Sequence, residues 1–263
     1  MTKIALITGG SSGLGFELAK NLAGQGYTPI LLARNREKID RAVSDISSSG
    51  HEAIGFPCDI TDEIRLREVC AEVQERFGYI DFLILNAGVV TCKLLCDYAS
   101  AEELKRDLEI DLWGTILSAH VFLPLLDPGA KILMISSGFG LMGAAGYSVY
   151  AAAKAGMINF AESLRRELLH RKVSVYVACP GDMDTPQYHE EQRTMPEWMK
   201  QEAPRGMMHP AVAAGKILKK CSGRRFLIII NGEIMALMLL TKLTPRWFRD
   251  AMLDRMFPIP KAE

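Results

Sequence analysis

The chain has 263 residues, of which 49% are hydrophobic, enough for one large domain with a sizeable core. Lys plus Arg and Asp plus Glu both number 31, which excludes a strong overall charge that would attract nucleic acid. From residue 216 to the end, however, ten Lys or Arg stand against four Asp or Glu. This basic end on an otherwise acidic body makes an anionic surface a candidate partner.

The cysteine pattern excludes the common metal and redox motifs. Six cysteines form neither a CxxC pair nor a Cys/His cluster with zinc spacing, so we expect reduced thiols and no metal. A bridge between Cys92 and Cys96 is the alternative. A strand-like segment begins at Lys3, which predicts that there is no signal peptide and that the protein is cytoplasmic.

Apolar runs alternate with helical patterns along the chain. Most of the runs are nearly continuous in Val, Ile and Leu, as in parallel strands covered on both faces. The predicted strands are 4–7, 28–33, 53–57, 82–85, 131–135, 173–178 and 226–230, and the predicted helices are 13–24, 37–48, 62–77, 101–123, 150–170 and 210–220. This alternation predicts a single α/β domain with a doubly wound sheet.

Two segments depart from that rhythm. Residues 182–209 form a Met-rich loop, which we assign to substrate binding within a catalytic domain of residues 1–231. Residues 232–263 form an apolar and basic C-terminal extension of the same domain.

The first strand ends in a glycine-rich turn that opens the first helix. It reads Thr8-Gly9-Gly10-Ser11-Ser12-Gly13-Leu14-Gly15. Glycines let the backbone approach a pyrophosphate closely, and the helix N-terminus then holds the phosphates electrostatically. The spacing is Gly-x3-Gly-x-Gly, which differs from the usual dinucleotide fingerprint. The position after an N-terminal strand predicts cofactor binding, and a purely structural turn is the alternative.

The end of the second strand indicates which nicotinamide cofactor is bound. An NAD site places an acid here for the ribose hydroxyls, whereas an arginine accommodates the 2′-phosphate of NADP. Ala33 provides no acid, and Arg34 provides a fork-shaped cation suited to phosphate, with Arg36 as a second contact. NADP is therefore predicted. The alternative is that these arginines are ordinary exposed residues at the start of a helix.

Tyr150 and Lys154 are four residues apart, so they share one face of a helix, and Ser137 precedes the tyrosine by thirteen residues. A free phenol has a pKa of about 10, and a cation within about 4–6 Å favours its ionised form. Lys154 is therefore predicted to assist proton transfer by Tyr150.

In combination, these features resemble the motif series of the classical short-chain dehydrogenase/reductase family over residues 3–231. The matching positions are 8–15, Asn86-Ala87-Gly88, Ser137, Tyr150, Lys154 and Pro180-Gly181. The resemblance implies a Rossmann-type fold with seven parallel strands flanked by helices. It also implies hydride transfer between a nicotinamide and a carbonyl or alcohol without a metal, and assembly as a homodimer or homotetramer.

The resemblance also implies roles for individual residues. Tyr150 gives or takes the proton at the substrate oxygen, and Ser137 holds that oxygen by a hydrogen bond. Lys154 lowers the pKa of the tyrosine and contacts the nicotinamide ribose. The implied cofactor contacts are Asp59 at the adenine amino group, the adjoining Ile60, Asn86 in the cofactor crevice, and Thr185 at the carboxamide.

One position departs from the family pattern. Where the family has an asparagine that supports a water chain to the lysine, this chain has Asp111. Its carboxylate is expected to stabilise the Lys154 ammonium and to weaken the pull of that ammonium on the phenol.

The substrate is predicted to be a bulky, lipid-like ketone, because methionines adapt to irregular apolar shapes. The apolar side chains in question are Met183, Met195, Trp198, Met199, Met207 and Met208; core filling or a dimer contact is the alternative. Residues 32–35, 184–186 and 191–194 are similar to the branch that contains 3-ketodihydrosphingosine reductase, which makes that ketone the first candidate. A 3-oxoacyl, steroid or other carbonyl reductase, and a non-catalytic NADP sensor, are the competing hypotheses.

The C-terminal extension carries a further prediction. Residues 226–243 are mostly apolar, but charged residues interrupt them and make a membrane span unfavourable. Residues 244–257 alternate apolar side chains with arginines, which is typical of an amphipathic helix at a lipid surface. Packing over the substrate mouth or against another subunit is the alternative.

Overall fold

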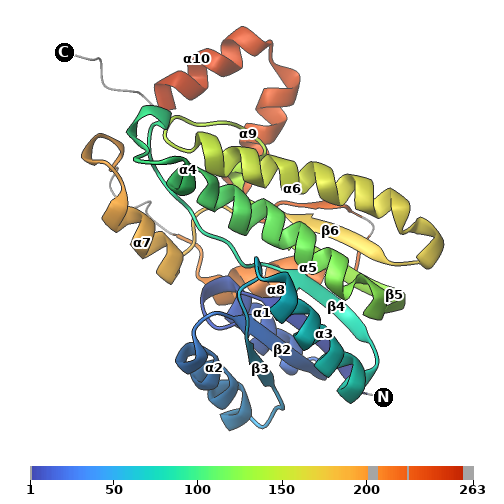
Figure 1. Ribbon diagram of the computed structural model, residues 1–263. Coiled ribbons are helices and arrows are strands. Elements are labelled where there is room, and N and C mark those ends of the chain that lie inside the picture. Colours follow the sequence, from blue (N-terminus) through green and yellow to red (C-terminus); the bar gives the residue numbers. More distant parts are fainter. Residues whose placement is uncertain (1, 201–206, 224, 257–263) are drawn as a thin grey trace.

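A computed structural model describes residues 2–200, 207–223 and 225–256 of the chain. Seven parallel strands form one sheet in the order β3-β2-β1-β4-β5-β6-β7 (Figure 1). The strands are β1 (Lys3–Thr8), β2 (Tyr27–Ala33), β3 (Ile54–Pro57), β4 (Ile80–Leu85), β5 (Leu126–Ile135), β6 (Ser174–Ala178) and β7 (Leu227–Ile228). All seven predicted strands are confirmed, with β7 shorter than predicted.

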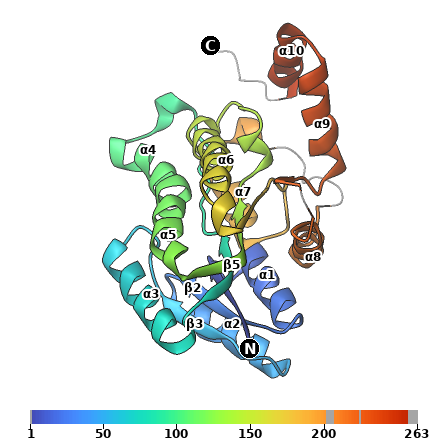
Figure 2. The same cartoon turned by 90° about the vertical axis from the view of Figure 1, so that its right-hand side faces the viewer.

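Helices cover both faces of the sheet (Figure 2). Along β1, Ile4 and Leu6 belong to one core cluster, whereas Ala5 and Ile7 belong to the other, because successive side chains of a strand point to opposite faces. One face is covered by α1 (Gly13–Ala23), α2 (Arg36–Ser48) and α8 (Pro210–Lys220), and the other by α3 (Glu63–Phe77), α5 (Gly114–Phe122) and α6 (Ser148–Glu167). The predicted doubly wound single domain is confirmed.

The helix predicted over 101–123 is divided. It consists of α4 (Ala101–Asp107), a π-helical segment (Leu108–Trp113) and α5. A π-helical turn carries an extra residue and is frequent at functional sites. By length and composition alone, the stretch Ala101–Leu125 is the one within the described residues that would suffice to cross a membrane. Half of its most apolar window is buried in the fold, so this match carries little weight.

The segment predicted as a substrate loop contains a helix, α7 (Pro186–Thr194). Thr185 caps its N-terminus by accepting a hydrogen bond from the Tyr188 N–H, and Pro186 occupies the first helical position, where its fixed φ is favourable. The sequence of α7 is polar and lacks an apolar stripe, which is why helical periodicity did not reveal it. Residues 201–206 of the loop lie outside the described residues.

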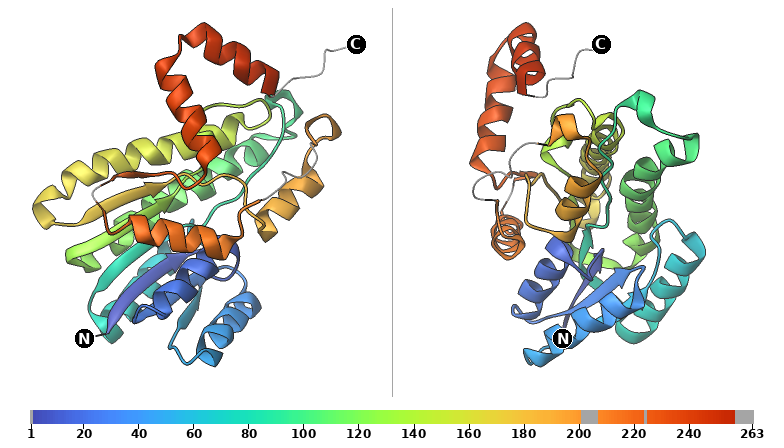
Figure 3. Two further views of the ribbon diagram at one scale, coloured as in Figure 1. Left: turned by 180° about the vertical axis from the view of Figure 1, so that it is seen from behind. Right: turned by 90° about the vertical axis from the view of Figure 1, so that its left-hand side faces the viewer.

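Two helices follow the sheet, α9 (Gly232–Leu243) and α10 (Arg246–Met256). Ile234, Met235 and Met238 of α9 pack against the core, whereas no residue of α10 is buried. Both helices project from the body of the molecule (Figures 1 and 3). The predicted C-terminal helix is confirmed over Arg246–Met256; Phe257 lies outside the described residues.

Candidate active site

A cavity of about 350 Å³ opens at the carboxyl ends of the central strands. The strand order reverses between β1 and β4, the usual position of a ligand crevice in an open α/β sheet. Most of the predicted site residues line this cavity: Gly9, Ser11, Ser12, Gly13, Leu14, Arg34, Asp59, Ile60, Asn86, Ala87, Gly88, Ser137, Tyr150, Lys154, Pro180, Gly181 and Thr185.

The glycine-rich turn has the geometry that a pyrophosphate requires. Gly9 and Gly13 have φ values of 66° and 54°, a region that favours glycine. A Cβ on Gly15 would lie 2.3 Å from the carbonyl oxygen of Gly9, so only glycine lets α1 approach the turn this closely. Ser12, the N-cap of α1, makes no side-chain capping bond there, and no acidic residue stands in the first turn. The N–H groups of this helix end can therefore hold phosphate.

Thr8 and Gly15 shape the cavity without lining it. The Thr8 hydroxyl accepts hydrogen bonds from the backbone N–H groups of Asn86 (2.9 Å) and Ala87 (3.1 Å), which joins the ends of β1 and β4. The Asn86 side chain donates to the Thr8 carbonyl oxygen at 3.1 Å. Thr8 therefore supports the cofactor crevice from behind.

At the β2 end of the cavity, the structure corrects one predicted contact. Arg34 lines the cavity, but Arg36 turns away and pairs with Asp40 at 3.0 Å, since the two residues are one helical turn apart on the exposed face of α2. Lys38 lines the cavity instead. The sequence contained a signal for Lys38, a basic residue in the first turn after the second strand. Asp59 also lines this end, and its Oδ1 accepts bonds from the N–H and the hydroxyl of Thr61.

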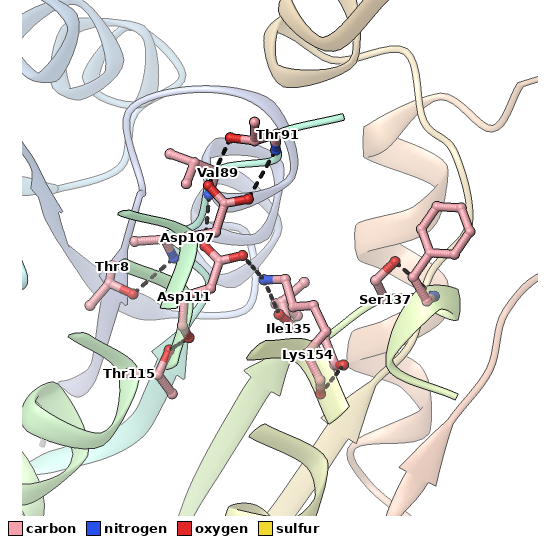
Figure 4. Close-up of polar contacts among 12 residues, drawn as sticks. Thr8, Val89, Thr91, Asp107, Asp111, Thr115, Ile135, Ser137 and Lys154 are labelled. Atoms are coloured by element: carbon pink, nitrogen blue, oxygen red, sulfur yellow. Dashed lines mark hydrogen bonds and ion pairs between the residues drawn. The ribbon is translucent and has the colours of Figure 1, made fainter. Parts of the chain in front are cut away.

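Of the four residues predicted to be catalytic, Ser137, Tyr150 and Lys154 converge from two elements, and Asp111 reaches Lys154 from a third. Tyr150 and Lys154 lie on α6, and Ser137 follows β5. The Lys154 Nζ lies 5.4 Å from the centre of the Tyr150 ring. It donates a hydrogen bond to the carbonyl oxygen of Ile135 at 3.4 Å (Figure 4). Ser136, next to Ser137, donates to the carbonyl oxygen of Lys154. Ser137, which precedes Tyr150 by thirteen residues, is therefore the serine whose side chain is hydrogen-bonded to the phenol of Tyr150.

Asp111 lies in the π-helical segment, and its side chain contacts Lys154. The carboxylate is completely buried; its Oδ2 lies 3.3 Å from the Lys154 Nζ, and its Oδ1 accepts a bond from the Val89 N–H at 2.7 Å (Figure 4). The backbone carbonyl of Asp111 accepts a bond from the Thr115 hydroxyl at 2.7 Å. A Cβ on Gly88 would come within 2.8 Å of the carboxylate and 3.1 Å of the Lys154 Nζ. Glycine is therefore required beside this ion pair.

A second buried acid, Asp107, lies one helical turn before Asp111 and was missed by the sequence analysis. It accepts hydrogen bonds from the N–H and the hydroxyl of Thr91. Its four-residue spacing from Asp111 was the available signal. These bonds fix the chain segment that follows β4 to the helix that carries both acids.

The net shift of the Tyr150 pKa is upward, opposite to the shift that Lys154 alone is predicted to cause. Burial raises the pKa of the phenol and the charge of Asp111 raises it further, against a hydrogen bond to Ser137. Burial also raises the pKa of Asp111 to about 6, although Lys154 opposes this shift. The Lys154 ammonium is paired with the Asp111 carboxylate at 3.3 Å, and the charge of that carboxylate acts on the pKa of the phenol in the opposite direction to a cation. Tyr150 therefore remains protonated at neutral pH.

The substrate side of the cavity combines apolar and acidic side chains. Of the six apolar residues singled out, Met183 lines the cavity, whereas Met195 and Met199 pack with Cys92 and Tyr147 in a small core cluster. The alternative of core filling therefore holds for those two methionines. The lining also includes the apolar residues Val89, Val90 and Phe139, together with Asp182, Tyr188 and Glu191.

Comparisons with known proteins agree with this geometry. The family model for short chain dehydrogenases matches residues 3–196, and the chain belongs to that oxidoreductase family. It is 30% identical to human 3-oxoacyl-[acyl-carrier-protein] reductase and 35% identical to carbonyl reductase family member 4 of Xenopus laevis. Each match spans 187 residues, covering 70% of this chain and 77% of the relative.

Solved structures share the fold over almost the whole chain. A short-chain dehydrogenase from Burkholderia phymatum in complex with NAD has a TM-score of 0.82 at 24% identity, with 99% of this chain and 98% of that chain covered. A short-chain dehydrogenase from Burkholderia cenocepacia in complex with NADP has a TM-score of 0.77 at 27% identity, with 88% and 97% covered.

Proposed function

We propose that the protein is an NADP-dependent reductase of a ketone. The observation that carries this proposal is that Ser137, Tyr150 and Lys154 line the same cavity as the glycine-rich turn, so a proton donor lies beside the site proposed for the nicotinamide cofactor. Tyr150 donates the proton, Ser137 holds the substrate oxygen, and Lys154 contacts the nicotinamide ribose. When bound, the reduced nicotinamide supplies the hydride.

The preference for NADP is supported by the charges at the β2 end of the cavity. Arg34 and Lys38 line that end, and Ala33 provides no acid for the ribose hydroxyls. A 2′-phosphate would be held there by two cations, with Arg34 giving the bidentate geometry that phosphate favours.

The proposed substrate is a bulky, lipid-like ketone, with 3-ketodihydrosphingosine as the first candidate. Two observations support this substrate. The apolar residues Met183 and Phe139 line the cavity, and short sequence segments are similar to the branch that contains 3-ketodihydrosphingosine reductase. The second candidate is a 3-oxoacyl reductase, which the name of the human relative favours. A homodimer or homotetramer is proposed as the assembly.

Turnover of a panel of ketones with NADPH and with NADH tests these proposals together. The panel contains a long-chain sphingoid ketone, a 3-oxoacyl thioester and a steroid ketone. We expect oxidation of NADPH with at least one of them and a fall of about 100-fold or more in Tyr150→Phe, since general acid catalysis contributes about 10²–10⁴-fold. If the cofactor bound and no carbonyl were reduced, a sensor would be the better reading.

We further propose that α9 and α10 make peripheral contact with a lipid surface on the cytoplasmic side. Leu239, Leu243, Trp247, Phe248 and Met256 are exposed there, with Arg246 and Arg255 beside them. The protein should sediment with anionic liposomes, and a Trp247→Ser, Phe248→Ser variant should lose most of this binding. The matched control, Ile64→Ser, removes an equally exposed apolar side chain from α3 and should bind like the wild type. Equal sedimentation of all three proteins would reject the proposal.

A further inference from the structure

The carboxylate of Glu191 is fixed on the substrate side of the cavity. Glu191 lies on α7 and lines the cavity, and its Oε1 accepts a hydrogen bond of 2.5 Å from the Tyr147 hydroxyl. Tyr147 is buried and stacks on Phe139, with ring centres 4.3 Å apart and planes inclined by 19°. Phe139 lines the same cavity. An aromatic surface and a positioned carboxylate thus meet beside the catalytic residues.

Glu191 is close enough to the reacting centre to act on it electrically. Its charge contributes to the raised pKa of the Tyr150 phenol. Asp182 lines the same side of the cavity, and its charge adds to the effect of burial in raising the pKa of Glu191. The cations Arg34 and Lys38 line the opposite, β2 end. The charged residues named on the substrate side are both acidic, whereas the β2 end, where phosphate is proposed, carries two cations and the acid Asp59.

The Glu191 carboxylate favours a positively charged substrate over an uncharged one. A bound hydrocarbon would remove water from a half-buried carboxylate and offer nothing in return, which costs free energy. An ammonium group would instead form a charge-assisted hydrogen bond with the carboxylate and a cation–π contact with an aromatic ring. A ketone with a nearby amine is thus complementary to the carboxylate, and its chain can lie against the apolar lining residues Val90, Phe139 and Met183.

We infer that Glu191 is a specificity-determining residue that selects ketones carrying a positively charged amine near the carbonyl, an inference that rests on the proposed reductase function. It separates the two substrate candidates, because 3-ketodihydrosphingosine carries such an amine and a 3-oxoacyl thioester does not. In this role Glu191 binds the substrate and takes no part in proton transfer.

The competing role is structural, since the hydrogen bond from Tyr147 also fastens α7 to α6. Glu191→Gln distinguishes the two roles because the amide oxygen still accepts that bond while the charge is lost. Glu190→Gln is the matched control. Glu190 is the neighbouring residue of α7, lies exposed outside the cavity lining and pairs with Arg193 at 2.6 Å.

The test compares a long-chain 2-amino-3-ketone with the same ketone lacking the amine, each reduced with NADPH. The measured quantity is the ratio of the two kcat/KM values. We expect the wild type and Glu190→Gln to favour the amino ketone at least tenfold, and Glu191→Gln to lose about 10- to 100-fold of that ratio, as for a hydrogen bond to a charged group. Acetylation of the substrate amine should remove the same preference in the wild type.

The outcomes distinguish a failure of the proposed role of Glu191 from a failure of the proposed reductase function. An unchanged ratio in Glu191→Gln, or an acetylated amine reduced as well as the free amine, would overturn the inference and leave the reductase function standing. Absence of turnover with every ketone would overturn the reductase function, and the inference with it.

Discussion

Replacement of Asp111 by Asn is the most informative perturbation of the proton-transfer site. The side chains have nearly the same shape, and the amide oxygen can keep the bond from the Val89 N–H. What disappears is the negative charge 3.3 Å from the Lys154 Nζ. Lys154 then acts on the Tyr150 ring, 5.4 Å away, without compensation.

The size of the effect follows from Coulomb's law. If the 5.4 Å from the Lys154 Nζ to the centre of the Tyr150 ring is taken as the separation of the charges, two unit charges interact by about 3 kcal/mol, or about two pKa units, at an effective dielectric constant of about 20. Asp111 also raises the pKa of the phenol directly. We therefore expect the pKa of Tyr150 to fall by about one to two units in Asp111→Asn.

The pH dependence of alcohol oxidation measures this shift, because the oxidation requires the phenolate as proton acceptor. The rising limb of kcat/KM should move to lower pH by about one to two units, while ketone reduction at pH 7 stays similar or rises. Asp107→Asn is the matched control, as Asp107 binds Thr91, and should move the limb less. If the rising limb of the pH profile did not move in Asp111→Asn, the reasoning would be refuted. A large loss of ketone reduction would also refute it, and would show that the Asp111 carboxylate is itself needed for the reaction.

The same variant makes a prediction about stability. Burial raises the pKa of Asp111 from 3.8 to about 6, so between these values the folded protein holds a proton that the unfolded chain has released. This contribution to stability is complete below about pH 4 and is lost as the pH rises through 6. Two pKa units correspond to about 3 kcal/mol. The unfolding free energy of the wild type, relative to Asp111→Asn, should fall by about that amount between pH 4 and pH 7 in denaturant titrations.

Two other substitutions test the cofactor site and the ion pair. Arg34→Ser should raise the KM for NADPH about 10- to 100-fold and leave that for NADH nearly unchanged; an equal effect on both cofactors would contradict a 2′-phosphate contact. Gly88→Ala places a Cβ 2.8 Å from the Asp111 carboxylate and should cost about 1–3 kcal/mol of stability together with activity. Gly143→Ala is its control, since a Cβ there meets open space, and a melting temperature that fell equally in both variants would refute the steric argument.

The architecture and much of the site could be predicted from the sequence because they depend on local patterns. Continuous apolar strands and helical periodicity gave seven strands in the correct places. The glycines of the first turn and the spacing of Ser137, Tyr150 and Lys154 identified residues that line one cavity. Even the departure at Asp111 was visible, and the expected meeting of this acid with Lys154 is present at 3.3 Å.

What the sequence could not provide were the features that depend on contacts between distant segments. Arg36 and Lys38 lie in the same helix turn, yet only Lys38 faces the cavity. Helix α7 has no apolar stripe, so the position of Glu191 became visible only through its hydrogen bond with Tyr147, the residue that precedes α6.

By itself, the sequence determined the family and the doubly wound fold, and it selected the residues that we propose transfer the proton, because these features depend on short-range spacing. Only the tertiary structure decided the electrostatics around them. The pKa of Tyr150 depends on its burial and on charges that the fold brings from the π-helical segment and from α7. Burial and the distance between charges are properties of the packed chain, and they set the direction of the shift.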